Sequence, residues 1–405
     1  MNITAYAPEY FDDVNRQWNE VGWVEAGNER ETKAQRTWLT MGNGSVALVD
    51  GHAEAFGHWA PGSVWYVDRP VSLCAVTAIT TSRVARRQGL ATALTARALR
   101  QGKEEGFTLA GLGIFDQGFY DRFGFGTSSY EHRFSFDPAS LKIESSSRTP
   151  VGLSADDHEE IHALMSRRHL AHGAVRLDPP ELIKAELLWT ESPFGLGFRD
   201  DDGRLTHFIY GKGKGESGPY SVQWMGFEEP GQMRELLALI KGLSDQVASV
   251  VIWEPPGIQL QDFIDRPFRQ RTRSTKSDHE TSHHAAAFTQ LRILDLESAM
   301  AARTWVGPEI RFNLTLHDPI EDIEPEVSIA GDYVVTIGAE STVEAGTDKD
   351  APTLQASVAA LTRLWIGVRN ATTLAASDNL VGSPELLKAL DAAFALPEPR
   401  QGWYY

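Results

Sequence analysis

The residues best suited to chemistry lie in positions 79–91, where an apolar run meets a short basic loop. The loop carries Arg86, Arg87 and Gln88, and Gly89 stands directly before an apolar series with helical spacing. The first backbone N–H groups of a helix have no partner within the helix, and with the positive end of the helix dipole they attract anions. Glycine lets the main chain approach phosphate oxygens without a Cβ atom in the way. The pattern predicts a binding loop for a diphosphate group.

Two strands and a helix must position this loop. From Leu90 the apolar residues recur at helical spacing, and Gly106 ends the predicted helix. Residues 107–115 form a second apolar run and predict the next strand. Residues 117–126 follow directly and read Gln-Gly-Phe-Tyr-Asp-Arg-Phe-Gly-Phe-Gly, with Tyr120 among them. The predicted order is strand, basic loop, helix, strand and an aromatic segment with glycines.

This order resembles the GCN5-related N-acetyltransferases, the GNAT family. The resemblance rests on Arg-x-x-Gly-x-Ala at 86–91 and on Phe-Tyr-x-x-x-Gly-Phe at 119–125. A basic glycine loop alone also fits an ordinary solvated turn, so the two motifs are needed together. In that family the loop holds the diphosphate of acetyl-coenzyme A (acetyl-CoA). The resemblance implies an acetyl-CoA-dependent N-acetyltransferase that needs no metal ion.

Length and charge set limits on the architecture and on the partners. A chain of 405 residues predicts two or three domains. The formal charge is −17, because 55 acidic residues outnumber 38 basic ones. This excess disfavours nucleic acid as a partner and favours a cationic small molecule.

The lone cysteine and the N-terminus favour a cytoplasmic protein. Cys74 cannot form a disulfide within the chain, which indicates a reducing compartment. It lies in an apolar run, so a small buried side chain is favoured over a nucleophile. The first residues lack the basic and apolar parts of a signal peptide, and no window reaches the length of a membrane span.

We place the domain boundaries at 1–138, 139–287 and 288–405. The second unit repeats the order of strand, turn and helix at 221–240, but Glu228 and Glu229 stand in its turn where the first unit has arginines. Two carboxylates would repel a diphosphate, so the second unit is predicted to be a degenerate copy. Other expected elements are a helix at 155–169, strands at 205–210, 220–227 and 333–337, a loop at 270–284, and helices at 355–366 and 384–394.

The resemblance extends over nearly the full length. Residues 291–300, 371–376 and 386–394 look like the C-terminal region of the Eis-type (enhanced intracellular survival) acetyltransferases. That family implies an α/β (α+β) chain with tandem GNAT domains, the second degenerate, followed by a sterol-carrier-protein-like α+β domain. Its best-known members acetylate amines of aminoglycosides and form hexamers. The resemblance thus implies an aminoglycoside or other cationic amine as acceptor, and a homohexamer.

The family's functional positions are carried over by motif. Tyr120 falls on the general-acid tyrosine, and Tyr405 falls on the C-terminal aromatic residue whose carboxylate enters the active site. Cofactor binding is assigned to the loop and to the strand before it. These residues are Ile79, Thr80, Thr81, Arg86, Arg87, Gln88, Gly89, Leu90 and Ala91.

The chemistry of acetyl transfer agrees with these roles. The amine must lose a proton, and the carboxylate of Tyr405 can attract the cation and accept that proton. Tyr120, with an ordinary pKa of about 10, is protonated at neutral pH and can donate to the leaving thiolate. A backbone N–H near residues 79–81 would polarise the carbonyl group. The aromatic end Trp-Tyr-Tyr predicts a docked terminus, because three aromatic side chains are costly to leave in water.

Several residues have alternative interpretations. Trp23 and Trp38 are candidates for the acceptor pocket, together with acidic residues such as Glu25 and Glu29, although core tryptophans and a solvated charged face fit equally well. The segment 158–162 matches the His-Glu-x-x-His helix of zinc hydrolases, with Glu181 as a possible third ligand.

Two further alternatives concern the later parts of the chain. Three histidines, His279, His283 and His284, could form a metal cluster, although a polar linker is favoured there. The third unit could also make the chain a lipid or sterol carrier instead of an enzyme.

Overall fold

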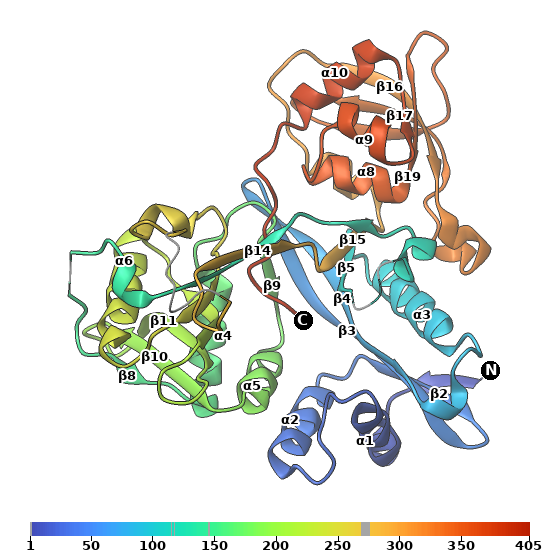
Figure 1. Ribbon diagram of the computed structural model, residues 1–405. Coiled ribbons are helices and arrows are strands. Elements are labelled where there is room, and N and C mark those ends of the chain that lie inside the picture. Colours follow the sequence, from blue (N-terminus) through green and yellow to red (C-terminus); the bar gives the residue numbers. More distant parts are fainter. Residues whose placement is uncertain (1, 115, 117, 145, 269–275) are drawn as a thin grey trace.

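The computed structural model describes residues 2–114, 116, 118–144, 146–268 and 276–405. Its strands form three sheets, and helices cover their faces (Figure 1). The predicted strand at 107–115 is shorter than expected, since β5 spans Leu109–Gly113, and Phe115 and Gln117 lie outside the described residues.

The first sheet has the strand order β1-β2-β3-β4-β5-β15-β6, with β9 paired to the free part of β3. Helices α1 and α2 precede the long β3–β4 hairpin, and α1 buries Phe11, Val14 and Trp18 along one face. Helix α3 connects β4 to the parallel strand β5. The bounds are β1 Asn2–Ala5, α1 Phe11–Glu20, α2 Glu29–Leu39, β2 Gly44–Val49, β3 His52–Tyr66, β4 Arg69–Thr81, α3 Leu90–Glu104, β6 Gly126–Thr127, β9 Val175–Leu177 and β15 Thr289–Ile293.

The second sheet has the order β14-β7-β13-β12-β11-β10-β8. Its centre repeats that of the first sheet, because α6 connects β12 to the parallel strand β13, which then pairs with antiparallel β7. The bounds are β7 Glu131–Phe136, β8 Val151–Gly152, α4 His158–Arg167, α5 Pro180–Trp189, β10 Pro193–Arg199, β11 Leu205–Lys212, β12 Tyr220–Gly226, α6 Pro230–Gly242, β13 Val250–Trp253 and β14 Ser282–Ala286.

The two sheets exchange strands. The chain leaves the first sheet at β6 and enters the second at β7, and it returns from β14 to β15 (Figure 1). Strand pairing therefore crosses the expected boundaries, because β7 pairs in the second sheet and β15 pairs in the first. The loop expected at 270–284 is wrong at its end, where β14 begins. This strand lies at a sheet edge with mostly exposed polar side chains, so it lacks the alternation that predicts a strand.

The third unit is a smaller sheet of order β18-β17-β16-β19-β20 with helices packed on it. The helix expected at 355–366 begins later, because residues 355–357 complete β19 and Ser357 caps α8. The bounds are α7 Leu296–Ala301, β16 Ile310–His317, β17 Gly331–Ile337, β18 Thr342–Ala345, β19 Thr353–Ser357, α8 Val358–Trp365, α9 Ala371–Ser377, β20 Leu380–Val381 and α10 Pro384–Ala393.

Short 3-10 helices fill several connections. They are η1 Pro8–Tyr10, η2 Arg83–Ala85, η3 Tyr120–Phe123, η4 Pro138–Ser140, η5 Ala155–Asp157, η6 Leu243–Asp245, η7 Leu260–Phe263, η8 Pro319–Asp322 and η9 Pro325–Val327. The most important for the site is η3, which carries Tyr120.

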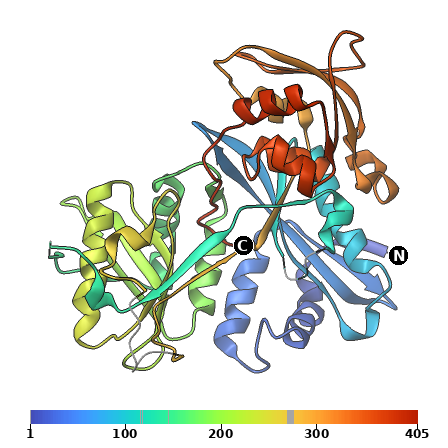
Figure 2. The same cartoon turned by 45° about the horizontal axis from the view of Figure 1, so that its top comes forward.

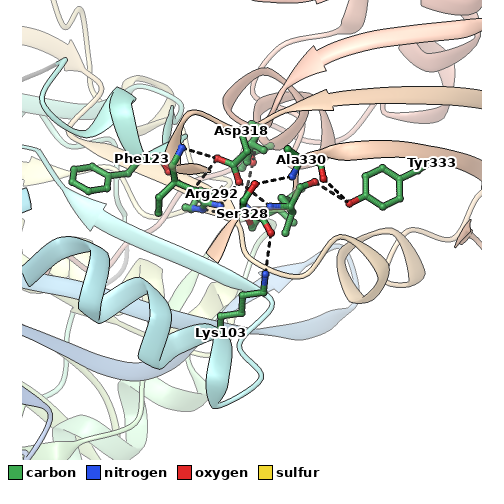
Figure 3. A network of polar contacts seen from close by, with 12 residues as sticks. Lys103, Phe123, Arg292, Asp318, Ser328, Ala330 and Tyr333 are labelled. Atoms are coloured by element: carbon green, nitrogen blue, oxygen red, sulfur yellow. Dashed lines mark hydrogen bonds and ion pairs between the residues drawn. The ribbon is translucent and has the colours of Figure 1, made fainter. Parts of the chain in front are cut away.

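A buried ion pair joins the third unit to the first (Figure 3). Arg292 of β15 contacts Asp318 at 2.8 Å, and both side chains are fully buried. Arg292 also donates to the backbone carbonyl of Phe123 at the end of η3. Lys103 of α3 donates to the carbonyl of Ser328 at 3.1 Å. Contacts with the third unit therefore fix the positions of α3 and η3, the two elements of the first unit on which the sequence motifs lie.

After α10 the chain returns to the centre of the molecule. In two views the C-terminus lies between the first sheet and the second unit, away from the third-unit helices (Figures 1 and 2). The backbone N–H of Val175 donates to the carbonyl of Gln401 at 2.9 Å, so the tail runs beside β9. The tail thus reaches the region where the first two units meet.

Candidate active site

A cavity of about 440 Å³ lies where β4 and β5 separate. The two strands pair only from Leu73 to Val76 on β4, opposite residues 109–112 of β5, and β4 then continues to Thr81 paired with β3 on its other side. Ala78 has φ of 54°, and the pairing of β3 with β4 shifts register at the same place. The opening between parallel strands exposes backbone groups at the cavity wall.

The cavity brings together several predicted residues from distant parts of the sequence. Its lining includes Trp23, Trp38, Ile79, Tyr120 and Tyr405. The tryptophans arise from the N-terminal helical region, Tyr120 from η3 and Tyr405 from the tail. The exposed fraction is 46% for Trp23 and 4% for Trp38. Both tryptophans therefore line the predicted pocket, Trp23 at its open side.

The predicted anion-binding loop lies beside the cavity at the start of α3. Gly89 is the N-cap residue with φ of 79°, a conformation that favours glycine, and no atom lies within 4 Å of a Cβ atom placed there. Arg86, Arg87 and Gln88 are exposed, and no described residue forms an ion pair with either arginine. The free N–H groups, two unpaired cations and open space fit the diphosphate of acetyl-CoA.

The other residues assigned to cofactor binding have different environments. Leu90 is buried in a small core cluster, and Ala91 is half-buried on α3. Thr80 is buried, and its hydroxyl donates to Gln17 at 3.5 Å. The hydroxyl of Thr81 is buried without a hydrogen-bond partner among the described residues. Side-chain contact with a cofactor is therefore restricted to the exposed part of the loop, while 79–81 can contribute backbone groups.

The corresponding helix of the second unit has its N-terminus occupied. Glu229 caps α6 and forms a reciprocal capping box with Gln232. Glu228 forms an ion pair with Arg167 at 2.8 Å. Carboxylate groups thus fill the place that an anion would take, which agrees with the prediction of a degenerate copy.

The C-terminal tail is fixed by contacts with the first two units. The backbone N–H of Gln401 donates to Glu131 at 3.1 Å. Trp403 is 1% exposed, and its ring lies against His162 and below the guanidinium of Arg168, 5.8 Å from the ring centre. The aromatic tail is therefore docked, as its composition predicts.

Tyr405 lies deep in the cavity beside β5. A Cβ atom on Gly111 would come within 2.5 Å of the Tyr405 hydroxyl, and one on Gly113 within 3.3 Å of a Tyr405 backbone oxygen. Burial is the main factor that raises the pKa of the Tyr405 phenol. Two glycines on β5 therefore provide the space that the C-terminal residue occupies.

Tyr120 is 4% exposed and packs against Phe119, Phe123 and Phe125. Burial raises the pKa of its hydroxyl to about 12. The carbonyl at the end of η3 accepts from Arg292, which fixes the helix that carries Tyr120 (Figure 3). At neutral pH the hydroxyl is protonated and can donate.

The sequence interpretation missed three residues of this cavity: Trp18, Glu186 and Trp189. Trp18 packs against Trp38 with ring centres 5.3 Å apart and against Trp189 at 5.7 Å. Burial raises the pKa of Glu186 to about 7. The available signal was the spacing of Glu186 and Trp189 by three residues, which puts them on one face of a largely apolar helix.

Two acidic residues proposed for the acceptor pocket lie elsewhere. Glu25 and Glu29 are exposed and are absent from the described lining of the cavity. The backbone N–H of Glu25 donates to Glu31 within the same loop and helix start. The acidic group in the pocket comes instead from Glu186 on α5, because that helix packs closely against α2.

The His-Glu-x-x-His segment on α4 has local structural contacts. The Nε2 atom of His162 lies 2.9 Å from the carbonyl oxygen of Leu177, and Nδ1 of His158 lies 3.1 Å from that of Ala155. Carbonyl oxygens accept hydrogen bonds, so these nitrogens carry protons and cannot ligate a metal at the same time. Among the described residues, no third ligand such as Glu181 joins them.

The alternative of a metal cluster formed by His279, His283 and His284 is not supported, because these three residues do not come together. His283 instead meets His132 of β7, with Nε2 and Nδ1 2.8 Å apart, and Glu254 lies nearby. The two rings are nearly parallel, 10° apart, with centres separated by 5.0 Å. This head-on geometry is that of an N–H···N hydrogen bond between the imidazoles.

Cys74 is buried at 0% exposure on β4, and burial is the main factor that raises the pKa of its thiol. Its Sγ atom contacts the carbonyl of Ala98 at 3.8 Å. A thiol in this environment stays protonated, so Cys74 is a packing residue.

Comparison with known proteins agrees with the geometry. Residues 2–128 match the acetyltransferase (GNAT) domain family, and residues 296–401 match the sterol carrier protein domain family. A protein named as an uncharacterized N-acetyltransferase from Streptomyces avermitilis is 26% identical over 381 residues, covering 86% of this chain and 84% of that protein. This chain is an N-acetyltransferase with a GNAT domain. The GNAT fold implies acetyl-CoA as its co-substrate.

Solved structures share the fold of the whole N-acetyltransferase. A GCN5-related N-acetyltransferase from Kribbella flavida has a TM-score of 0.77 at 19% identity, covering 100% of this chain and 98% of its own. A probable N-acyltransferase from Enterococcus faecalis has a TM-score of 0.81 at 15% identity, covering 100% of this chain and 99% of its own. Eis1 from Mycobacterium abscessus has a TM-score of 0.75 at 19% identity, covering 100% of both chains. The predicted α/β (α+β) fold class is confirmed.

No helix within the described residues is both long and apolar enough to cross a bilayer.

Proposed function

We propose that this N-acetyltransferase moves an acetyl group from acetyl-CoA to an amine of a cationic small molecule. The observation that carries the proposal is the single cavity that joins Tyr120, Tyr405 and the open end of β4. The loop before α3, with Arg86 and Arg87, binds the diphosphate. This arrangement supports a reaction inside the cavity with the nucleotide part of the cofactor outside it.

Each chemical requirement has a residue that can meet it. The carboxylate of Tyr405 attracts the ammonium group and accepts its proton, so that a neutral amine attacks the thioester. A backbone N–H at 79–81 polarises the carbonyl group. Tyr120, held neutral by burial, donates a proton to the thiolate that leaves. As the C–N bond forms and the C–S bond breaks, the amine loses two protons. One goes to the Tyr405 carboxylate and then to solvent, and the second, lost from the tetrahedral adduct, replaces the proton that Tyr120 gives to the thiolate.

The acceptor and the assembly are part of this proposal. The Eis-type resemblance supports an aminoglycoside as acceptor and a homohexamer as assembly, and the negative charge of the chain supports a cation in general. Multi-angle light scattering tests the hexamer directly. A mass of one or two chains under assay conditions would contradict it.

The test of the reaction is release of free thiol from acetyl-CoA with a panel of aminoglycosides, polyamines, monoamines and lysine-containing peptides. We expect thiol release that depends on one amine class, with the acetylated amine found by mass spectrometry. Absence of coenzyme A binding in calorimetry would overturn the proposal.

A carrier function is the second candidate, because residues 296–401 match the sterol carrier protein domain family. In the structure, the interior of this unit contains buried apolar side chains, among them Leu314, Leu354, Trp365 and Leu390. Native mass spectrometry separates the candidates. Stoichiometric lipid together with no thioester consumption would favour the carrier.

A further inference from the structure

Glu186 occupies an unusual position in the acceptor cavity. It supplies the one acidic side chain among the described lining residues, and no lysine or arginine is among them. Glu186 is half-buried, and no described residue forms a hydrogen bond or ion pair with its carboxylate. A partly desolvated carboxylate without a partner is costly, so a cation from outside the chain would stabilise it.

The surroundings of Glu186 suit a compact cation. Trp18, Trp23, Trp38 and Trp189 line the same cavity, and Trp18 contacts each of the other three rings at 5.3–5.7 Å. Indole faces attract cations through the ring quadrupole, and the attraction is strongest where water is excluded. A carboxylate beside a group of tryptophans is a recognised combination for binding ammonium groups.

The remaining wall is apolar or neutral. Ile79, Leu177 and Leu182 also line the cavity. His58, whose ring lies 4.4 Å from that of Trp38, stays neutral because burial lowers its pKa to about 3. Besides Glu186, the site has one other anionic group among its described lining residues, the terminal carboxylate of Tyr405. These two carboxylates can pair with at most two ammonium groups, so a polycation would place its remaining ammonium groups against indole and aliphatic carbon, at a large desolvation cost.

We propose that Glu186 is a specificity-determining residue that binds an ammonium group of an amine with an apolar body and no more than two positive charges. The inference rests on the proposed function and narrows its acceptor. Glu186 and the tryptophans select the cation, and the apolar wall takes the carbon skeleton. Aminoglycosides, which carry several ammonium groups, are then poor acceptors, so this inference departs from the acceptor that the Eis-type resemblance supports.

The effect of burial on the pKa of Glu186 also supports its role in binding a cation. Desolvation raises the pKa of Glu186 to about 7, and no charged side chain of the described residues contributes to this shift. Pairing with an ammonium group would restore the ionised form and lower this pKa. In the free protein the carboxyl group of Glu186 has no cationic partner among the described residues, so it remains available to a cation from outside the chain.

The test uses benzyltrimethylammonium, a cation that cannot be acetylated, and benzyl alcohol, which keeps the ring but lacks the charge. Tryptophan fluorescence and calorimetry on the full chain at pH 8 measure both affinities. We expect Glu186→Gln to weaken binding of the cation by about tenfold or more and to leave benzyl alcohol binding unchanged. Trp189→Leu should also weaken binding of the cation. Glu181→Gln, on the same helix but outside the described lining, is the matched control.

The outcomes separate this inference from the proposed function. If coenzyme A binds but Glu186→Gln leaves cation affinity unchanged, the inference is wrong and the proposed function stands. A higher kcat/KM for an aminoglycoside than for benzylamine would also overturn it. If coenzyme A does not bind, the proposed function fails, whereas loss of cation binding in Glu186→Gln would still support the cation subsite.

Discussion

Tyr120 illustrates how burial sets the chemistry of a single residue. Removal of its hydroxyl in Tyr120→Phe keeps the ring that packs against Phe119 and Phe125. We expect kcat to fall by about 100-fold or more, which is the range for loss of a general acid, while the Kd of coenzyme A stays unchanged. Thiol-release kinetics and calorimetry measure the two quantities. An unchanged kcat would remove Tyr120 from the mechanism.

Glu186 predicts a pH dependence of acceptor binding. With a pKa of about 7, its carboxyl group is mostly neutral at pH 6 and mostly ionised at pH 8. Affinity for benzyltrimethylammonium should therefore rise with pH across this interval. The phenols of Tyr120, Tyr404 and Tyr405 line the cavity, and because burial raises their pKa values they stay neutral throughout.

The same titration with Glu186→Gln is the control. The variant should show a flat profile between pH 6 and 8. A profile that keeps the slope of the unmodified protein would assign the titration to another group.

The sequence could identify those residues whose motifs are local. Tyr120 and the loop at 86–91 lie in short segments with a recognisable order, and Tyr405 is marked by its place at the chain end. Glu186 and Trp189 could not be found in this way, because they enter the site through the packing of α5 against α2. That contact joins segments about 150 residues apart, so the spacing of the two residues on α5 indicates a shared helix face but not the cavity that this face lines.

At the scale of elements, the N-terminus of α3 is the proposed binding site for the cofactor diphosphate. Arg86→Ala removes an exposed cation next to the free N–H groups, and we expect the Kd of coenzyme A to rise by about tenfold with a weaker dependence on salt. Calorimetry at two ionic strengths measures both effects. Arg234→Ala, an exposed arginine on the corresponding helix α6, is the matched control and should leave the Kd unchanged.

Regular elements were predicted well where their periodicity was strong. Helix α3, strand β11 and helix α10 agree with expectation to within about two residues. Strand β14 was missed because its side chains are mostly polar and exposed, and the start of α8 was misplaced because β19, with alternating exposed and buried residues, runs directly into it. In both cases the pairing partner, which lies far away in sequence, decides the conformation.

At the scale of the whole molecule, the third unit delivers the chain end to the cavity. Addition of Gly-Ser after Tyr405 would move the terminal carboxylate away from its place beside Gly113. We expect the loss of most acetyl transfer, with coenzyme A affinity and melting temperature little changed. The same two residues added before Met1 are the control, and retention of full activity by the C-terminal variant would exclude the carboxylate from catalysis.

The crossing of the chain between the first two sheets has a consequence for how this enzyme can be divided. Residues 2–128 on their own lack β15, which pairs with both β5 and β6, and the second unit on its own lacks its central contact with β7 if it is cut at 139. Either fragment would expose an open sheet edge, which favours aggregation. We therefore expect the first two units to fold together, since each fragment lacks a strand of its own sheet when the chain is cut between them.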